Sequence, residues 1–264
     1  MNRQTKIAAV QLSANIPRST ERLFYILNCI KDAAKSGAKL VLFPELTLTC
    51  TYNTSNKNMG ERSATETIST LMSVAQESNI YTVIGLEMIG NQDCHSSEDH
   101  YNVLACFHPD GKTVSKYTKI NLTAAEKQIW CRDLSEGLPI IQSPFARFGG
   151  ALGLESYNPL LRMALYAGGL DLYLAPAETT PSTWMASMIH IACESRCFVI
   201  SACKNSGSCI VSPFGDIIAE SHQNEAVLYG DIQLKTCIKG RFDLDCVGHC
   251  AMDSIFSLKS RLQI

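Results

Sequence analysis

Short apolar runs alternate with helical patterns along almost the whole chain, and this alternation limits the possible folds most strongly. Ile7–Leu12, Lys39–Phe43 and Tyr81–Ile89 are apolar runs typical of buried strands. Between them, Thr20–Ser36 and Glu66–Ser78 carry apolar residues at helical spacing. Strands and helices that alternate in this way predict an α/β architecture in layers, with the helices outside the sheets.

The second half of the chain continues the alternation. A turn at His108–Gly111 between two apolar runs predicts a hairpin. Two helices are expected at Pro159–Ala167 and Ser182–Ser195. The remaining expected strands are Leu138–Ser143, Phe145–Leu154, Leu170–Ala175, Cys197–Ala202, Ser208–Val211, Ile217–Glu220 and Ala226–Ile232. The sequence shows no repeat, linker or low-complexity tract, so we expect one domain over residues 1–264.

Composition excludes several classes of protein. The chain has 264 residues, of which 46% are hydrophobic, and this is enough for a substantial core. A net charge of −2 gives no basic field to hold nucleic acid or an anionic membrane. No apolar run reaches the roughly 18–20 residues of a membrane span. The first residues lack the pattern of a secretory signal, so we expect a cytoplasmic protein without nucleic acid or membrane partners.

The chain contains 12 cysteines, and half of them lie within apolar runs. For a chain of this length, in which we expect no secretory leader, the interpretation as small buried hydrophobes is favoured over a disulfide framework. The stretch Cys246–Cys250 matches no common zinc spacing, so we expect no metal site. The cysteines expected to be buried are Cys29, Cys106, Cys193, Cys197, Cys203 and Cys209.

Chemistry is expected where polar residues follow buried strands. Glu45 follows KLVLFP, and Lys119 and Glu126 follow the second strand of the hairpin. From spacing alone, Glu45 is either a functional acid or a loop carboxylate, and Lys119 is either a cation of lowered pKa or a surface lysine. The run GGALGLES at residues 149–156 predicts a strand followed by a sharp elbow, the usual place of a nucleophile in α/β enzymes. His190 is expected to pack inside its helix.

Several segments resemble, in order and over nearly the whole chain, the nitrilase superfamily of carbon–nitrogen hydrolases, and most closely its nitrilase branch. They are KIAAVQL, LVLFPE, YNVLACFHPDG with KTVSKYTKI, AAEKQIW, PLLRMALYAGGLDLYLAP, WMASMIHIACESRCFVISAC, SPFGDIIAE and RFDLDCVGHCA. The resemblance implies a four-layer αββα sandwich. It also implies that two protomers pack through the helices after the elbow into an αββααββα dimer, which often assembles further.

The family uses a cysteine nucleophile, a glutamate base, a lysine and a second glutamate. The resemblance places the base at Glu45, the lysine at Lys119 and the second glutamate at Glu126. The family's Cys-Trp-Glu-Asn pattern falls on residues 153–156, which read Gly-Leu-Glu-Ser. Gly153 therefore stands at the expected position of the nucleophile and has no side chain to attack with.

The resemblance also indicates a pocket for a small molecule and no cofactor. The residues expected to bind the ligand are Tyr52, Leu154, Glu155, Ala177 and Glu178, with pocket walls at Thr51–Thr65 and Glu178–Thr183. The family's long insertion before SPFG is absent, because residues 204–207 join the two strands directly.

Three hypotheses about function follow. The first is a non-catalytic nitrilase homologue that binds a small molecule or a partner subunit, as a homodimer, a larger homo-oligomer or an assembly with active nitrilases. The second is a repurposed enzyme that uses Glu45, Lys119 and Glu126 for acid–base or imine chemistry. The third is slow residual hydrolysis of nitriles or amides by direct attack of water. In each case we expect little ordinary nitrilase activity.

Overall fold

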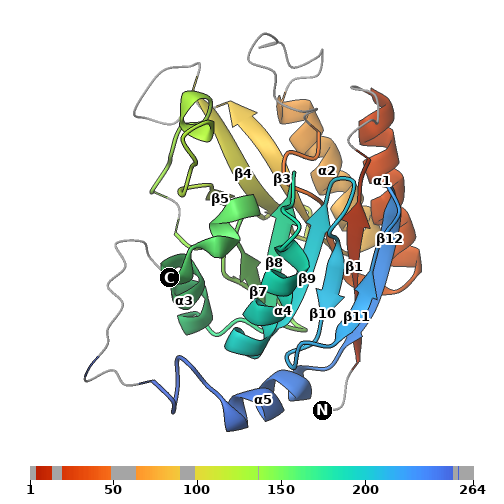
Figure 1. The fold of residues 1–264 in the computed structure, drawn as a ribbon. Helices are drawn as coiled ribbons and strands as arrows, with labels where there is room; N and C mark the ends of the chain where they lie inside the picture. The colour runs from red at the N-terminus through yellow and green to blue at the C-terminus, as the bar shows by residue number, and fades with distance from the viewer. Residues whose placement is uncertain are drawn as a thin grey trace.

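The computed structural model describes residues 4–13, 20–48, 64–89, 99–135, 137–251 and 255. Its strands form two mixed sheets of six strands, in the orders β12-β1-β2-β3-β4-β5 and β11-β10-β9-β8-β7-β6 (Figure 1). The elements of the first half are β1 Thr5–Gln11, α1 Thr20–Lys35, β2 Ala38–Leu42, α2 Ala64–Ser78, β3 Tyr81–Ile89, β4 His100–Phe107 and β5 Val114–Thr118. Those of the second half are β6 Ile141–Gln142, β7 Arg147–Gly150, α3 Pro159–Ala167, β8 Leu172–Ala177, α4 Trp184–Ser195, β9 Phe198–Cys203, β10 Cys209–Val211, β11 Ile217–Glu220, β12 Ala226–Ile232 and α5 Leu234–Asp243.

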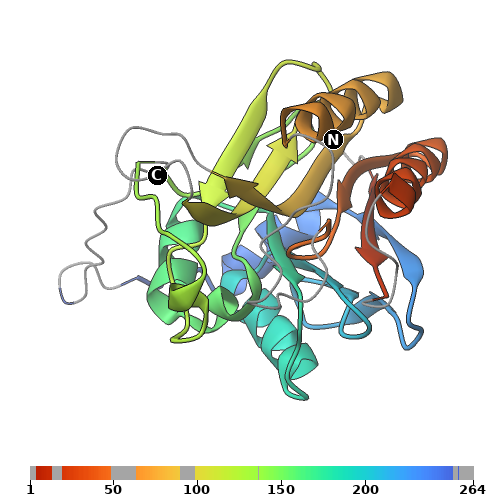
Figure 2. The same cartoon turned by 90° about the horizontal axis from the view of Figure 1, so that it is seen from above.

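The sheets lie face to face, with helices on both outer sides. Helices α1 and α2 cover the first sheet and α3 and α4 cover the second, as the view from above shows (Figure 2). Apolar side chains of both sheets, among them Leu42, Tyr117, Phe148 and Tyr173, form one core between them. A second core lies between the first sheet and its two helices. The expected four-layer αββα sandwich is therefore confirmed.

Parallel strands in each sheet bring several chain segments to one end of the sandwich. Strands β1, β2 and β3 are parallel to one another, and so are β7, β8 and β9. An isolated parallel bridge between Leu12 and Lys204 joins β1 to β9 across the two sheets at that end. The loops after these strands consequently meet where α/β proteins usually hold their sites.

Some local predictions were wrong. The strands expected at Leu138–Ser143 and Phe145–Leu154 are confined to β6 and β7. The chain leaves β7 early, because Leu152 already begins a 3₁₀ turn over Gly153–Tyr157. Helix α5 was not expected, since LKTCIKGRFD has no clear apolar period.

Side chains outside the core were also partly mispredicted. His190 is not packed in its helix: its side chain is 66% exposed and its Nε2 atom lies 3.6 Å from Glu194. Of the six cysteines expected to be buried, five are, and Cys193 is half-buried.

Among the helices in the described part of the chain, none has the length and apolar content that a bilayer crossing requires.

Candidate functional site

Glu45 is held at the end of β2 by an unusual backbone. Pro44 fixes the chain before it, and Leu46 after it has a left-handed φ of 50°, which is uncommon for a residue with a branched side chain. The loop crosses β3 at Gly85, where an added Cβ would lie 2.5 Å from the Cα of Glu45. Gly85 donates its N–H to the carbonyl of Pro44 over 3.1 Å and accepts from Thr47 N over 2.8 Å. The absence of a side chain at Gly85 therefore permits the position of Glu45.

The carboxylate of Glu45 meets Lys119 and Glu126 in one cluster. Nζ of Lys119 donates to Oε1 of Glu45 over 2.7 Å and to Oε1 of Glu126 over 2.6 Å. Nδ2 of Asn102, a buried residue of β4, donates to the same Oε1 of Glu45 over 2.8 Å. Thr123 donates its N–H to the other oxygen of Glu126 over 2.8 Å. The structure thus brings together the three side chains that the sequence placed in a common site, and adds Asn102.

Charge pairing shifts the pKa values of Lys119 and Glu126 in this cluster. Burial disfavours the cation of Lys119, but the neighbouring carboxylates of Glu45 and Glu126 outweigh burial and raise its pKa. Burial likewise disfavours the charged form of Glu126, yet the hydrogen bond and charge of Lys119 hold its pKa below the usual value. At neutral pH the arrangement is therefore a fully ionised amine between acids.

Gly153 lies directly against Glu45. It begins the 3₁₀ turn after β7 with a φ of +53°, a conformation that side chains rarely adopt. A Cβ built there would be in close contact with Oε2 of Glu45 and 3.2 Å from its Cδ. Geometry alone thus shows that a side chain at residue 153 would face the acid of the cluster.

The elbow after Gly153 is braced by Glu155, which is buried. Its Oε1 accepts from the hydroxyl of Tyr117 over 3.0 Å and from the backbone N–H groups of Ile120 and Asn121 over 3.0 and 2.8 Å. Burial raises the pKa of Glu155. Because residues 120 and 121 follow Lys119 directly, Glu155 connects the elbow to the loop that positions the lysine.

The second sheet contributes another charged pair. Glu178 follows β8 and donates its N–H to Oε2 of Glu45 over 3.2 Å. Its Oε1 accepts from Nζ of Lys204, the residue after β9, over 2.9 Å. Glu45 is consequently bonded to groups from both sheets.

The other residues expected in the pocket are placed differently. Leu154 is 47% exposed and Ala177 is completely buried as the last residue of β8. Tyr52 lies outside the described residues. Sequence reasoning missed Asn102, Lys204 and Gly85; only Gly85, an isolated glycine inside a strand pattern, carried a local signal of close backbone approach.

Cysteines offer no thiol to the cluster within the described ranges. Cys203 is the last residue of β9 and is buried, its Sγ lies 3.1 Å from the hydroxyl of Ser201, and burial raises its pKa to about 12. Cys131 is half-buried, and burial raises its pKa too. No cysteine of the described part hydrogen-bonds to Glu45, Lys119 or Glu126, and Cys50 lies outside it.

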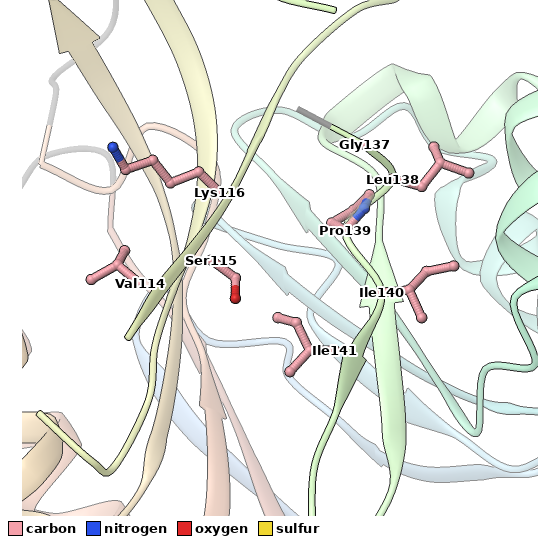
Figure 3. Close-up of a pocket in the computed structure, with 8 residues that line it drawn as sticks. All are labelled: Val114, Ser115, Lys116, Gly137, Leu138, Pro139, Ile140 and Ile141. Carbon is pink, nitrogen blue, oxygen red and sulfur yellow. The ribbon is translucent and has the colours of Figure 1, made fainter. Parts of the chain in front are cut away.

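A separate pocket of about 410 Å³ lies between the edges of the two sheets. Val114, Ser115 and Lys116 of β5 line one side, and residues 137–141 line the other (Figure 3). Ser115 is directed toward Ile141, whereas Lys116 is directed away (Figure 3). None of the predicted site residues lines this pocket.

In the described ranges, His, Cys, Asp and Glu side chains form no group of three able to hold a metal ion.

Comparisons with known proteins agree with this architecture. Residues 6–242 match the carbon-nitrogen hydrolase family. An aliphatic nitrilase of Sinorhizobium fredii is 30% identical over 95% of this chain and 94% of its own length. A nitrilase of Bradyrhizobium diazoefficiens is 28% identical over 96% of this chain and 91% of its own.

Solved structures share the fold at lower identity. Nit3 of Saccharomyces cerevisiae, a member of branch 10 of the nitrilase superfamily, has a TM-score of 0.81 and 21% identity, covering 94% of this chain and 97% of its own. An amidase of Nesterenkonia sp. AN1, in a complex with butyramide, has a TM-score of 0.75 and 20% identity, covering 91% and 95%. The family match over residues 6–242 spans most of the chain and includes Glu45, Lys119 and Gly153, and on this ground the chain belongs to the carbon-nitrogen hydrolase family.

Proposed function

We propose that this protein is a carbon-nitrogen hydrolase homologue without a nucleophile, which binds a small molecule or a partner subunit and has little ordinary nitrilase activity. The observation that carries the proposal is Gly153. Its backbone faces Oε2 of Glu45 at close range, where the family resemblance puts the attacking sulfur, and glycine offers no atom that can attack.

The chemistry of the family explains why this one position matters. A thiolate attacks the nitrile carbon and water then hydrolyses the covalent intermediate, with an acid group as base and an amine that stabilises developing charge. Glu45, Lys119 and Glu126 supply the base and the amine in a geometry suited to those roles. Removal of a nucleophile from other hydrolases costs on the order of a million-fold in kcat. An intact acid–amine cluster without a thiol therefore supports binding better than turnover.

The test measures ammonia release from a panel of aliphatic and aromatic nitriles and amides. We expect none above background from the natural chain. Gly153→Cys adds a thiol opposite Glu45, and Gly153→Ala is its matched control because it adds the same Cβ without sulfur. Both variants require Glu45 to shift, since the added Cβ meets its carboxylate. Ammonia release by Gly153→Cys above Gly153→Ala is the expected result.

Two outcomes would contradict the proposal. One is ammonia release by the natural chain at a kcat of about 1–1000 per second, the ordinary range of enzymes. The other is equal, negligible activity of two well-folded variants, which would contradict the assignment of the lost activity to residue 153, because more than the thiol would then be missing from the site.

The remaining properties are proposed on narrower grounds. We propose a single domain that forms a homodimer or larger oligomer through α3 and α4, where Leu160 is 64% exposed. Free cysteines throughout the described part fit a reducing compartment such as the cytoplasm.

A further inference from the structure

A serine and a histidine form a hydrogen-bonded pair beside the pocket between the two sheet edges. Oγ of Ser115, in β5, lies 3.0 Å from Nε2 of His108, the residue that follows β4. Ser115 lines the pocket of about 410 Å³, and its hydroxyl is directed toward Ile141 on the opposite side (Figure 3). His108 itself does not line the pocket. The hydroxyl therefore lies between the imidazole and the space that a ligand would occupy.

The hairpin holds the two side chains on one face of the sheet. Ser115 pairs with Cys106 in the antiparallel ladder, and His108 lies two residues beyond Cys106, so all three share a face. The N–H of His108 donates to the carbonyl of Thr113 over 3.1 Å. The carboxylate of Asp110 accepts from the N–H and the hydroxyl of Thr113 over 2.8 and 2.6 Å. These bonds in the turn fix the position of His108 relative to Ser115.

The imidazole of His108 is suited to accept the proton of the serine. Partial burial lowers its pKa, while the charge of Asp110 acts in the opposite direction. The hydrogen bonds from Thr113 hold the pKa of Asp110 at about 2, so this carboxylate is ionised at neutral pH. The ring of Tyr81 packs against the imidazole with 5.2 Å between centroids. A neutral imidazole can thus take a proton, and the nearby negative charge favours the imidazolium that results.

A backbone donor lies next to the serine. Strand β5 is the outer strand of its sheet, and the N–H of Lys119 donates inward to Asn102 over 2.8 Å. Because the direction of N–H groups alternates along a strand, the N–H of Lys116 points to the free edge, where residues 137–141 form the other side of the pocket. In α/β hydrolases the N–H of the residue after the nucleophile binds the developing oxyanion. Lys116 has that position relative to Ser115.

We propose that Ser115 and His108 form a second site, a catalytic dyad that hydrolyses small carboxylic esters, with the N–H of Lys116 as the oxyanion donor. The site goes beyond the proposed function and is independent of it, because no residue of the Glu45 cluster lines the pocket. A volume of about 410 Å³ lies near the lower end of the range for small-molecule sites. Ile141 offers an apolar contact for a short acyl chain.

The reaction balances without an oxidant or reductant. The proton of the Ser115 hydroxyl moves to Nε2 of His108, and Oγ forms a bond to the ester carbon while the carbonyl π electrons move to oxygen, toward the N–H of Lys116. The carbonyl re-forms as the C–O bond to the alcohol breaks, and the alcohol oxygen takes the proton from His108. Water then gives a proton to His108 and attacks the acyl carbon. Oγ of Ser115 leaves with that proton, and the carboxylic acid is released.

Labelling with phenylmethylsulfonyl fluoride tests the nucleophile in the natural full-length chain. Oγ of Ser115 displaces fluoride at sulfur, and peptide mass spectrometry locates the modified serine. We expect labelling of Ser115 to be about a hundredfold or more faster than that of Ser69, because a general base contributes about 10²–10⁴-fold. Ser69 is exposed, and its hydroxyl donates to the carbonyl of Glu66 over 2.9 Å. Equal labelling of the two serines would overturn the proposal, and this comparison does not depend on the folding of a variant.

Hydrolysis of p-nitrophenyl acetate measures turnover. Ser115→Ala should lower the rate to that of the natural chain pretreated with phenylmethylsulfonyl fluoride. His108→Gln keeps a group that can hydrogen-bond to Ser115 but is not a base, and should lower the rate by about a hundredfold. Ser69→Ala is the matched control and should leave the rate unchanged.

Two results with folded variants would contradict the dyad. An unchanged rate in Ser115→Ala would overturn the site, and an unchanged rate in His108→Gln would overturn the role of the histidine as base. Circular dichroism establishes that each variant is folded. Ammonia release from nitriles is a separate readout, so failure of the ester assay leaves the proposed function standing.

Discussion

Lys119 connects two acids inside the sandwich, and its replacement should destabilise the protein strongly. The side chain is 1% exposed and lies 2.7 Å from Glu45 and 2.6 Å from Glu126. Lys119→Met keeps an unbranched apolar stem of similar length but removes the charge. The variant leaves Glu45 buried beside a second acid without a cation between them. Removal of one partner from a buried ion pair costs about 3–5 kcal/mol, and we expect a loss of unfolding free energy in this range at pH 7.

The loss should depend on pH in a defined direction. The pKa of Lys119 is raised above 10.5, so its stabilising contribution is complete below pH 10.5 and is lost as the pH rises through the folded value. The pKa of Glu126 is lowered below 4.5, so its contribution is present above pH 4.5 and is lost as the pH falls through the folded value. The difference between the natural chain and Lys119→Met should therefore be largest between about pH 5 and 10 and shrink below about pH 4.

Urea unfolding followed by tryptophan fluorescence measures this difference, since Trp130 and Trp184 are both buried. Lys35→Met is the matched control: it removes an exposed ion pair with Asp32, 3.1 Å apart, and should change stability by no more than about 1 kcal/mol. A Lys119→Met variant as stable as Lys35→Met at pH 7 would show that Lys119 does not stabilise the fold through a buried ion pair.

Two further predictions concern close approach and assembly. Gly85→Ala places a Cβ 2.5 Å from the Cα of Glu45, so we expect a loss of about 1–3 kcal/mol in urea unfolding; unchanged stability would contradict the crossing of this loop over β3. Leu160→Asp should shift the protein toward monomer in sedimentation velocity, whereas Leu134→Asp, at a side chain of nearly equal exposure outside α3 and α4, should not. Equal effects of both substitutions would argue against an interface through α3.

Local periodicity was sufficient for most elements of the fold. Helix Pro159–Ala167 has the predicted bounds, since Pro159 stands at its first position and Asn158 accepts from the N–H groups of Leu160 and Leu161 as its N-cap. Helix α5 has no comparable pattern: its charged residues and Gly240 interrupt the apolar spacing, and its contacts come from distant segments. Patterns within a segment therefore predict elements that are amphipathic by themselves and miss those that tertiary contacts stabilise.

The site was predictable only in the residues that follow a strand in a recognisable motif. Glu45, Lys119 and Glu126 met these conditions, and the structure places them in contact. Asn102 and Lys204 did not, because their roles depend on contacts with Glu45 and Glu178, which are distant in sequence. No window of neighbouring residues contains that information, since it arises from the register of the sheets.

The carboxylate of Glu45 joins the two sheets of the sandwich by hydrogen bonds. One of its oxygens is bonded to Asn102 and Lys119 in the first sheet, and the other is bonded to the backbone of Glu178 in the second. Glu45 thus contributes to the stability of the fold, whether or not the site catalyses a reaction. A substitution of Glu45 that abolishes function could act by weakening the contact between the sheets or by removing a chemical group. Measuring the free energy of unfolding on the same sample separates these two effects.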